Sequence, residues 1–205
     1  MLADPSSKAP FGLILEGKAV SPYFRAMAIL PIVEVPDPRL RQISSPVETV
    51  DDEVRSLISD MFETMYAAPG IGLAAIQVGV PKRILVIDLQ EEEDEEGRPI
   101  HDPRVFINPE IVETSPQQVP YNEGCLSVPE MYAEVDRPDR IHARWLDEHG
   151  AAHDREIEGL LATCLQHEMD HLNGILFIDH LSRLKREMLL RKLAKLRREQ
   201  GKKAA

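Results

Sequence analysis

Residues 166–171, with the sequence QHEMDH, constrain the fold most, because they place two histidines four positions apart and a glutamate directly after the first. On an α-helix, positions i and i+4 lie on one face about one turn apart, so His167 and His171 can bind the same metal ion. Glu168 projects roughly 100° away from His167 and can contact a water molecule on the ion without binding the ion itself. We therefore expect a metal-binding helix at the centre of the domain, with Glu168 as a general base.

An HExxH pattern also occurs by chance in helices whose histidines have ordinary structural roles. Here the flanking residues are apolar, which predicts a buried helix over residues 159–172 that ends at the Asn-Gly pair 173–174. Buried imidazoles and carboxylates need polar partners. A metal ion supplies such partners, so the flanks favour the metal-site interpretation.

Composition and charge limit the number of domains and the kinds of partner to be expected. The chain has 205 residues and is 43% hydrophobic, which fits one domain with a core of its own. The formal net charge is −11, yet residues 183–203 contain ten basic and two acidic residues. A net acidic body argues against specific DNA binding, whereas a basic terminal helix predicts one local contact with an anionic partner.

The two cysteines are too few for a disulfide framework, and no apolar stretch approaches the length of a membrane span or a signal peptide. We therefore expect a cytoplasmic protein that does not bind membranes.

The chain divides into an extension and a domain. Residues 1–27 contain three prolines and no sustained periodicity, so we expect a loosely attached extension, with Met27 as an alternative start. Residues 28–205 then form a single metallohydrolase domain. We predict an α+β fold, in which antiparallel or mixed sheets pack around the metal-binding helix between an N-terminal amphipathic helix and a C-terminal helix.

Local patterns give the expected elements. Apolar spacing predicts a helix over residues 51–67, and residues 83–89 are typical of a buried strand. The acidic run 91–96 predicts a solvated hairpin tip. Residues 105–113 predict a strand in which Pro109 requires an edge position or a bulge. Residues 141–146 should form a hairpin, through a turn at 147–150, with a segment that ends near residue 158.

The basic C-terminal helix, at about residues 181–203, should carry an apolar stripe made of Leu181, Leu184, Met188, Leu193 and Leu196.

A catalytic metal site needs a third protein ligand. Cys164 shares the helical face of His167 and His171 but lies roughly 6 Å or more from the ion along the axis, at about 1.5 Å per residue. We therefore place Cys164 in the wall of the site and favour Cys125, which follows a glycine in a separate segment. Spacing alone leaves other ligands open: His142, His149, His153, Asp179 and His180.

Three motifs together resemble the peptide deformylase family. They are GIGLAAIQ at 70–77, EGCLS at 123–127 and QHEMDH at 166–171, and they occur in the family's order and spacing. The likeness extends from about residue 28 to the C-terminal helix and is that of a bacterial-type member with a long C-terminal helix. Residues 131–132, Met-Tyr, depart from the basic residue that many members carry shortly after the second motif.

The resemblance implies a site and a reaction. Cys125, His167 and His171 would bind one metal ion, usually Fe(II), although Zn(II) or another divalent ion suits the same ligands. Glu168 would act as acid and base, with the Gln77 side chain and the Leu126 backbone N–H as an oxyanion hole. The substrate would be an N-formylmethionyl nascent peptide that releases formate. The expected substrate-binding residues are Ile71, Gly72, Leu160 and Cys164.

Two alternatives predict different behaviour. An HExxH metallopeptidase would take a ligand downstream of the motif, such as Asp179 or His180. A non-catalytic ribosome-binding module would use the basic helix and release no formate. In a deformylase the same helix is expected to dock the enzyme on the ribosome, where nascent chains emerge.

Overall fold

The structure is a computed structural model that describes residues 28–203. The expected extension over residues 1–27 and the alternative start at Met27 lie outside the described residues. In the described part of the chain, no helix is both long and apolar enough to cross a membrane.

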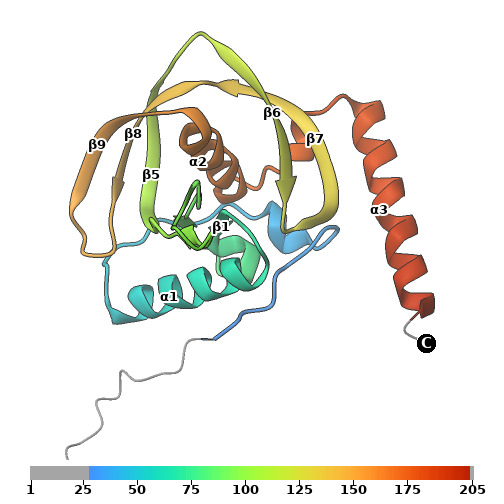
Figure 1. The fold of residues 1–205 in the computed structure, drawn as a ribbon, viewed down its shortest axis with the longest axis horizontal. Helices are drawn as coiled ribbons and strands as arrows, with labels where there is room; N and C mark the ends of the chain where they lie inside the picture. The colour runs from blue at the N-terminus through green and yellow to red at the C-terminus, as the bar shows by residue number, and fades with distance from the viewer. Residues whose placement is uncertain (1–27, 204–205) are drawn as a thin grey trace, which may run out of the picture.

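The predicted α+β class is confirmed, and every pairing between named strands is antiparallel. A five-stranded sheet has the order β1-β2-β5-β8-β9, and two separate hairpins, β3–β4 and β6–β7, accompany it (Figure 1). The strands are β1 (Gly72–Ala74), β2 (Ile84–Ile87), β3 (Glu92–Glu93), β4 (Pro99–Ile100), β5 (Arg104–Thr114), β6 (Gln118–Cys125), β7 (Val128–Pro138), β8 (Arg140–Leu146) and β9 (Ala152–Glu158).

Helix α2 (Gly159–Leu172) follows β9 directly and lies between the large sheet and the β6–β7 hairpin (Figure 1). Its bounds are those predicted, and ten of its 14 residues are buried. The helix ends at Asn173, and Gly174 has a φ of 72°. A Cβ at Gly174 would lie 2.6 Å from the Arg41 carbonyl oxygen, so only glycine fits this turn.

The sheet is covered on both faces, which explains why all four residues of β2 are buried. Leu85 and Ile87 pack in the same cluster as α2, whereas Ile84 and Val86 pack against α1 (Asp52–Ala67). Alternate side chains of a strand point to opposite faces, so each face receives two of them. Burial of each such side chain contributes about 1.5–3 kcal/mol. The Asp51 carboxylate caps α1 by accepting the Val54 N–H at 2.9 Å.

Pro109 occupies a bulge. Strand β5 lies between β2 and β8, but its pairing with β2 ends at Ile107, so Pro109 lies beyond that pairing. The register shifts between Ile107 and Glu110, and Asn108 there has a φ of 51°. The shift accommodates a residue that cannot donate a backbone hydrogen bond. The acidic run forms the expected hairpin, β3–β4, with most of its carboxylates exposed.

Helix α3 (Arg183–Lys203) packs on a third cluster, which includes Met131 of β7 and Phe177 of the 3-10 turn η3 (Phe177–His180). Leu193 is buried, and Leu189 and Leu196 are partly buried. The predicted apolar stripe is wrong at Leu184 and Met188, which are 68% and 61% exposed. Successive residues turn about 100°, which places these two side chains away from the face shared by residues 189, 193 and 196.

Two further 3-10 turns complete the described elements, η1 (Pro38–Arg41) and η2 (Ala75–Val78).

Candidate active site

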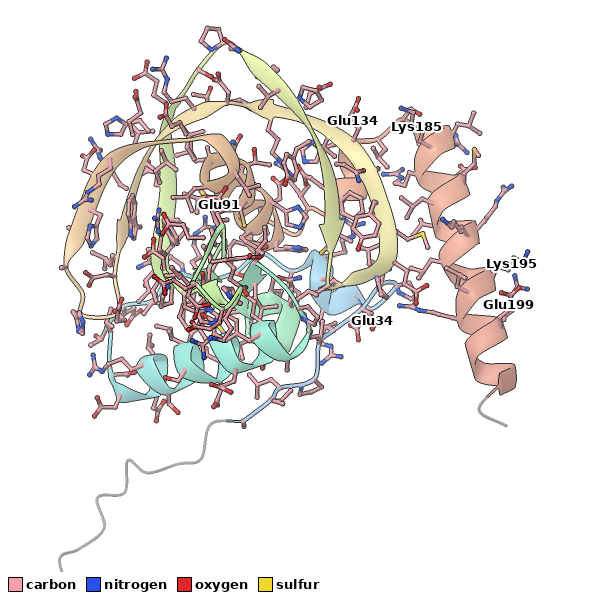
Figure 2. The ribbon with its side chains drawn as sticks, viewed as in Figure 1. Glu34, Glu91, Glu134, Lys185, Lys195 and Glu199 are labelled. Atoms are coloured by element: carbon pink, nitrogen blue, oxygen red, sulfur yellow. The ribbon has the colours of Figure 1, made fainter. Side chains whose placement is uncertain are left out.

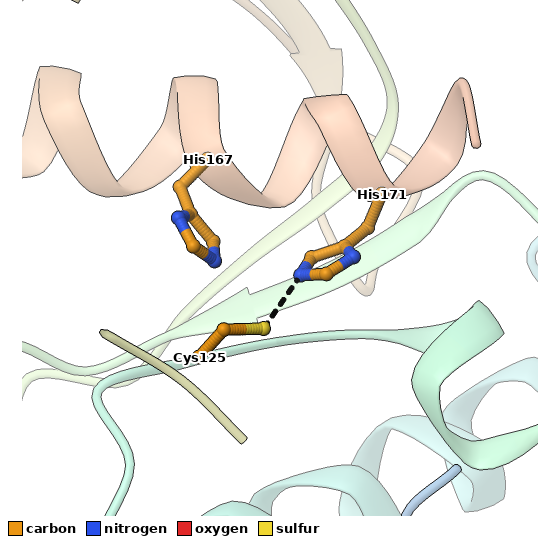
Figure 3. A group of neighbouring side chains, drawn as sticks. All are labelled: Cys125, His167 and His171. Atoms are coloured by element: carbon orange, nitrogen blue, oxygen red, sulfur yellow. Dashed lines mark hydrogen bonds between the residues drawn. The ribbon is translucent and has the colours of Figure 1, made fainter. Parts of the chain in front are cut away.

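Two elements bring together three side chains that could hold a metal ion, which we call the metal-binding group. His167 and His171 project from one face of α2, and Cys125 is the last residue of β6 (Figure 3). One ligand atom from each residue lies within 4.8 Å of the others, and Cys125 Sγ lies 3.2 Å from His171 Nε2. A thiolate with two imidazoles is a donor set that suits zinc or iron.

A local irregularity aims Cys125 at the helix. The β6–β7 register shifts between Gly124 and Cys125, which re-directs the side chain at the end of the strand. Gly124 is needed at this point, because a Cβ there would lie 2.5 Å from a ring carbon of Tyr132. The Tyr132 ring therefore lies against the backbone immediately before the cysteine.

A series of hydrogen bonds holds the His167 ring through its Nδ1 atom. His167 Nδ1 lies 2.6 Å from the Glu123 carboxylate, which leaves Nε2 free to act as a ligand. Arg137 donates to both oxygens of Glu123, at 2.5 and 3.0 Å, and to Asp170 at 2.9 Å. His180 lies 2.7 Å from Asp170, at the exposed end of this series of hydrogen bonds. We predicted no role for Glu123, Arg137 or Asp170 from the sequence.

The electrostatics of the group favour a bound cation. Burial lowers the pKa of His167, but the hydrogen bonds that the ring donates to Cys125 and Glu123 outweigh burial and hold that pKa well above its usual value. The same region therefore stabilises positive charge. Burial lowers the pKa of His171 well below its usual value, which keeps this imidazole neutral and able to bind a metal. The donor set and its surroundings thus fit a divalent metal ion.

Glu168 has the properties of a proton carrier. It is 4% exposed, and burial raises the pKa of its carboxyl to about 7. Oε2 of Glu168 has no hydrogen-bond partner within residues 28–203. A buried carboxyl with a pKa near neutrality and a free oxygen can take and return a proton.

Gln77 is held in one orientation. Its Oε1 accepts the Ala74 N–H at 2.8 Å, which directs Nε2 towards the metal-binding group. Nε2 donates to Ser127 Oγ at 3.1 Å and lies 3.6 Å from Cys125 Sγ. The amide can thus offer an N–H to an oxygen that binds beside the cysteine.

A cavity of about 540 Å³ opens over these groups. It is lined by Gln77, Cys125, His167 and Glu168, and also by Leu126 and the four expected substrate-binding residues, Ile71, Gly72, Leu160 and Cys164. A Cβ at Gly72 would lie 2.5 Å from Glu168 Oε1 and 2.9 Å from Cys164 Sγ. Glycine therefore allows β1 to pass close to Glu168 on α2.

The other candidate ligands have different partners and lie outside the metal-binding group. His142 bonds Asp154 and His153 bonds Asp147 within the β8–β9 hairpin, and His149 is in its turn. Asp179 pairs with Arg41 and Arg186, and His180 pairs with Asp170. The downstream ligand that a generic HExxH metallopeptidase would need is thus absent from the described cluster.

The sequence signal for Glu123 is its position in the same EGCLS motif as Cys125, two residues earlier. The structure places its carboxylate against His167 on α2. Arg137 gave no local signal, because it reaches Asp170 from 33 positions away in the chain.

Comparisons with known proteins agree with this geometry. The family model described as polypeptide deformylase matches residues 29–187. The peptide deformylase of Rhizorhabdus wittichii is 77% identical over 172 residues, which are 84% of this chain and 97% of that protein. That of Zymomonas mobilis is 66% identical over 172 residues, again 84% of this chain and 97% of that protein.

Solved structures give the same result. The peptide deformylase of Legionella pneumophila is 48% identical with a TM-score of 0.77, covering 85% of this chain and 98% of that one. The enzyme of Ehrlichia chaffeensis in complex with actinonin is 48% identical with a TM-score of 0.75, covering 82% and 98%. Neither a generic metallopeptidase nor a non-catalytic module finds support in these matches. The chain belongs to the peptide deformylase family and is an enzyme, a metal-dependent hydrolase.

Proposed function

We propose that this enzyme removes the formyl group from N-formylmethionyl nascent peptides, with Cys125, His167 and His171 holding one divalent metal ion. One observation supports the assignment of roles: Cys125 and His167 line the same cavity as Glu168, which has an unpartnered carboxylate oxygen, and Gln77, while His171 lies buried beside Cys125. When bound, the ion would lower the pKa of a water molecule and polarise the formyl carbonyl.

Glu168 moves the proton. It accepts the proton of the water that attacks the formyl carbon and later returns it to the departing methionine amine. A carboxyl pKa of about 7 suits both steps, because the group can be deprotonated before attack and protonated afterwards. The products are formate and a peptide with a free amino terminus.

Gln77 and Leu126 stabilise the developing charge. The Gln77 Nε2 group lies beside Cys125 and is fixed by the Ala74 backbone, so it donates to the formyl oxygen without reorganisation. The Leu126 backbone N–H, directly after Cys125, supplies a second donor. One such donor is worth about 3–4 kcal/mol of transition-state stabilisation.

Leu160 and Cys164 form part of the pocket for the methionine side chain. Both line the cavity from the same face of α2 as His167, and burial raises the pKa of the Cys164 thiol, which stays neutral and apolar. Ile71 and Gly72 lie at β1, which is the edge strand of its sheet. The substrate backbone can therefore add to this edge as a further strand.

Glu123 and Arg137 fix the orientation of His167. Their contacts are buried and join the β6–β7 hairpin to α2, so they hold Cys125 and the helix in one geometry. Partners of this kind around a metal ligand set both ring orientation and metal affinity.

The Glu168→Gln variant should bind metal normally but release formate from a formyl-Met tripeptide about 10²–10⁴-fold more slowly, because it cannot accept a proton. Cys125→Ala should lose the metal as well as the activity. Formate assays and metal analysis on the same preparations check both. A Cys125→Ala protein that keeps its metal would contradict this ligand set.

The Arg137→Ala variant should lose about 3–5 kcal/mol of stability, because Glu123 remains buried without its cation. Metal affinity should fall about 10–100-fold through the loosened His167. Denaturant unfolding and competition with a chelator measure the two effects. His180→Gln is the matched control, because His180 lies at the exposed end of the same hydrogen-bond network. This variant should change stability by at most about 1 kcal/mol. Equal losses of stability and metal affinity in the two variants would refute the role of Arg137 in holding Glu123 and His167.

We propose Fe(II) as the physiological ion, on the strength of the family resemblance. The ligand types suit zinc as well, so the choice depends on turnover. Protein purified without oxygen and loaded with Fe(II) should exceed the zinc form in formate release, and exposure to air should remove the advantage. Zinc protein that equals or exceeds the iron protein under anaerobic conditions would overturn the assignment.

We also propose that α3 docks the enzyme on ribosomes in the cytoplasm. Arg191, Lys195 and Arg198 are exposed on this helix, and Lys195 points away from the body of the protein (Figure 2). Ribosomal RNA offers phosphates to such a surface.

Removal of α3 is a poor test of docking, since Leu193 is part of the core. Instead, the triple variant Arg191→Glu, Lys195→Glu and Arg198→Glu should lose cosedimentation with ribosomes at low salt. Exposed arginines elsewhere provide the control: Arg98→Glu, Arg140→Glu and Arg155→Glu combined should retain binding. Equal cosedimentation of both triple variants would end the docking proposal.

A further inference from the structure

A groove of about 460 Å³ runs between β7 and α3. Residues 131–134 of β7 form one wall, and Lys185, Met188, Leu189 and Lys192 of α3 form the other. In Figure 2, Glu134 of β7 and Lys185 of α3 lie at the same end of the groove. The proposed chemistry uses none of the α3 residues.

The groove adjoins the active-site cavity. Met131 and Tyr132 line both spaces. Tyr132 is 67% exposed, and its ring lies against Gly124, one residue before Cys125. A peptide that leaves the cavity past this ring therefore enters the groove.

The groove combines apolar surface with positive charge. Met188 is 61% exposed and Leu189 is half-buried, so both α3 and Tyr132 present apolar surface. Lys185 and Lys192 are exposed along the rim, opposite the single carboxylate of Glu134. Such a surface fits an extended segment with an apolar side chain next to an acidic one.

We propose that this groove is an extended subsite for the part of the substrate that follows N-formylmethionine, with Tyr132 and Met188 contacting an apolar side chain. The inference rests on the proposed function. The reacting end is held in the cavity, so the following residues reach the groove at high effective concentration. An extended chain advances about 3.3 Å per residue, and a few residues therefore span the rim. Lys185 and Lys192 add a preference for acidic residues.

The experiment compares formyl-Met tripeptide with two formyl-Met heptapeptides, one carrying Leu and Asp at residues 4–6 and one carrying Ser and Lys there. The Leu/Asp heptapeptide should have a KM about three- to tenfold lower than the Ser/Lys heptapeptide, at similar kcat. Met188→Ser should reduce this difference, and the part that Lys185 and Lys192 contribute should remain. Leu184→Ser is the matched control, since Leu184 is equally exposed on α3 but does not line the groove.

Tyr132 is tested by two variants. Tyr132→Phe keeps the ring and should preserve the preference, whereas Tyr132→Ala should reduce it. Met188→Ser still decides the case if Tyr132→Ala disturbs the hairpin.

Equal KM values for the two heptapeptides in the unmodified enzyme, or equal effects of Met188→Ser and Leu184→Ser, would overturn the subsite. Self-association that is weakened by Met188→Ser would also overturn it, because the groove would then hold a second copy. Failure to deformylate the tripeptide would instead refute the proposed function, so the two failures are distinguishable.

Discussion

The buried ion pair between Arg137 and Glu123 is the interaction on which the site depends. The two side chains are only 5% and 3% exposed, and desolvation of such a pair costs more than a single contact regains. Here each charge has a second partner, since Glu123 also bonds His167 and Arg137 also bonds Asp170. Both second partners belong to α2. The pair therefore fastens the hairpin that carries Cys125 to the helix that carries both histidines.

This attachment explains how the proposed catalytic groups come from separate elements and still lie together. Helix α2 is buried between the sheet and the hairpin, so its histidines and Glu168 are removed from water, and burial raises the pKa of Glu168 to about 7. Gln77 comes from the turn after β1, where the Ala74 N–H orients its amide. A rigid frame of this kind supplies polar groups that need little rearrangement during reaction.

The sequence predicts the helices well because their signals are local. Apolar spacing and capping residues predict α1 and α2. The axial distance along α2 places Cys164 too far from an ion shared by His167 and His171 to bind it. The β6–β7 hairpin is not predicted in this way, since Pro120, Asn122 and Gly124 are typical of loops and most residues of β6 are exposed. Its pairing, and the Arg137 contacts, depend on residues distant in the chain. The stripe on α3 failed because a leucine-rich helix offers two apolar faces and only packing selects one.

We propose that β6 and α2 together supply one thiolate and two imidazoles to a single ion. X-ray absorption at the metal edge, on protein purified without oxygen, measures this ligand set directly. We predict one sulfur and two imidazole nitrogens per ion. A spectrum with nitrogen and oxygen ligands alone would show that Cys125 is not a ligand, and two sulfurs would indicate that Cys164 is one as well. Either result would contradict the proposed ligand set.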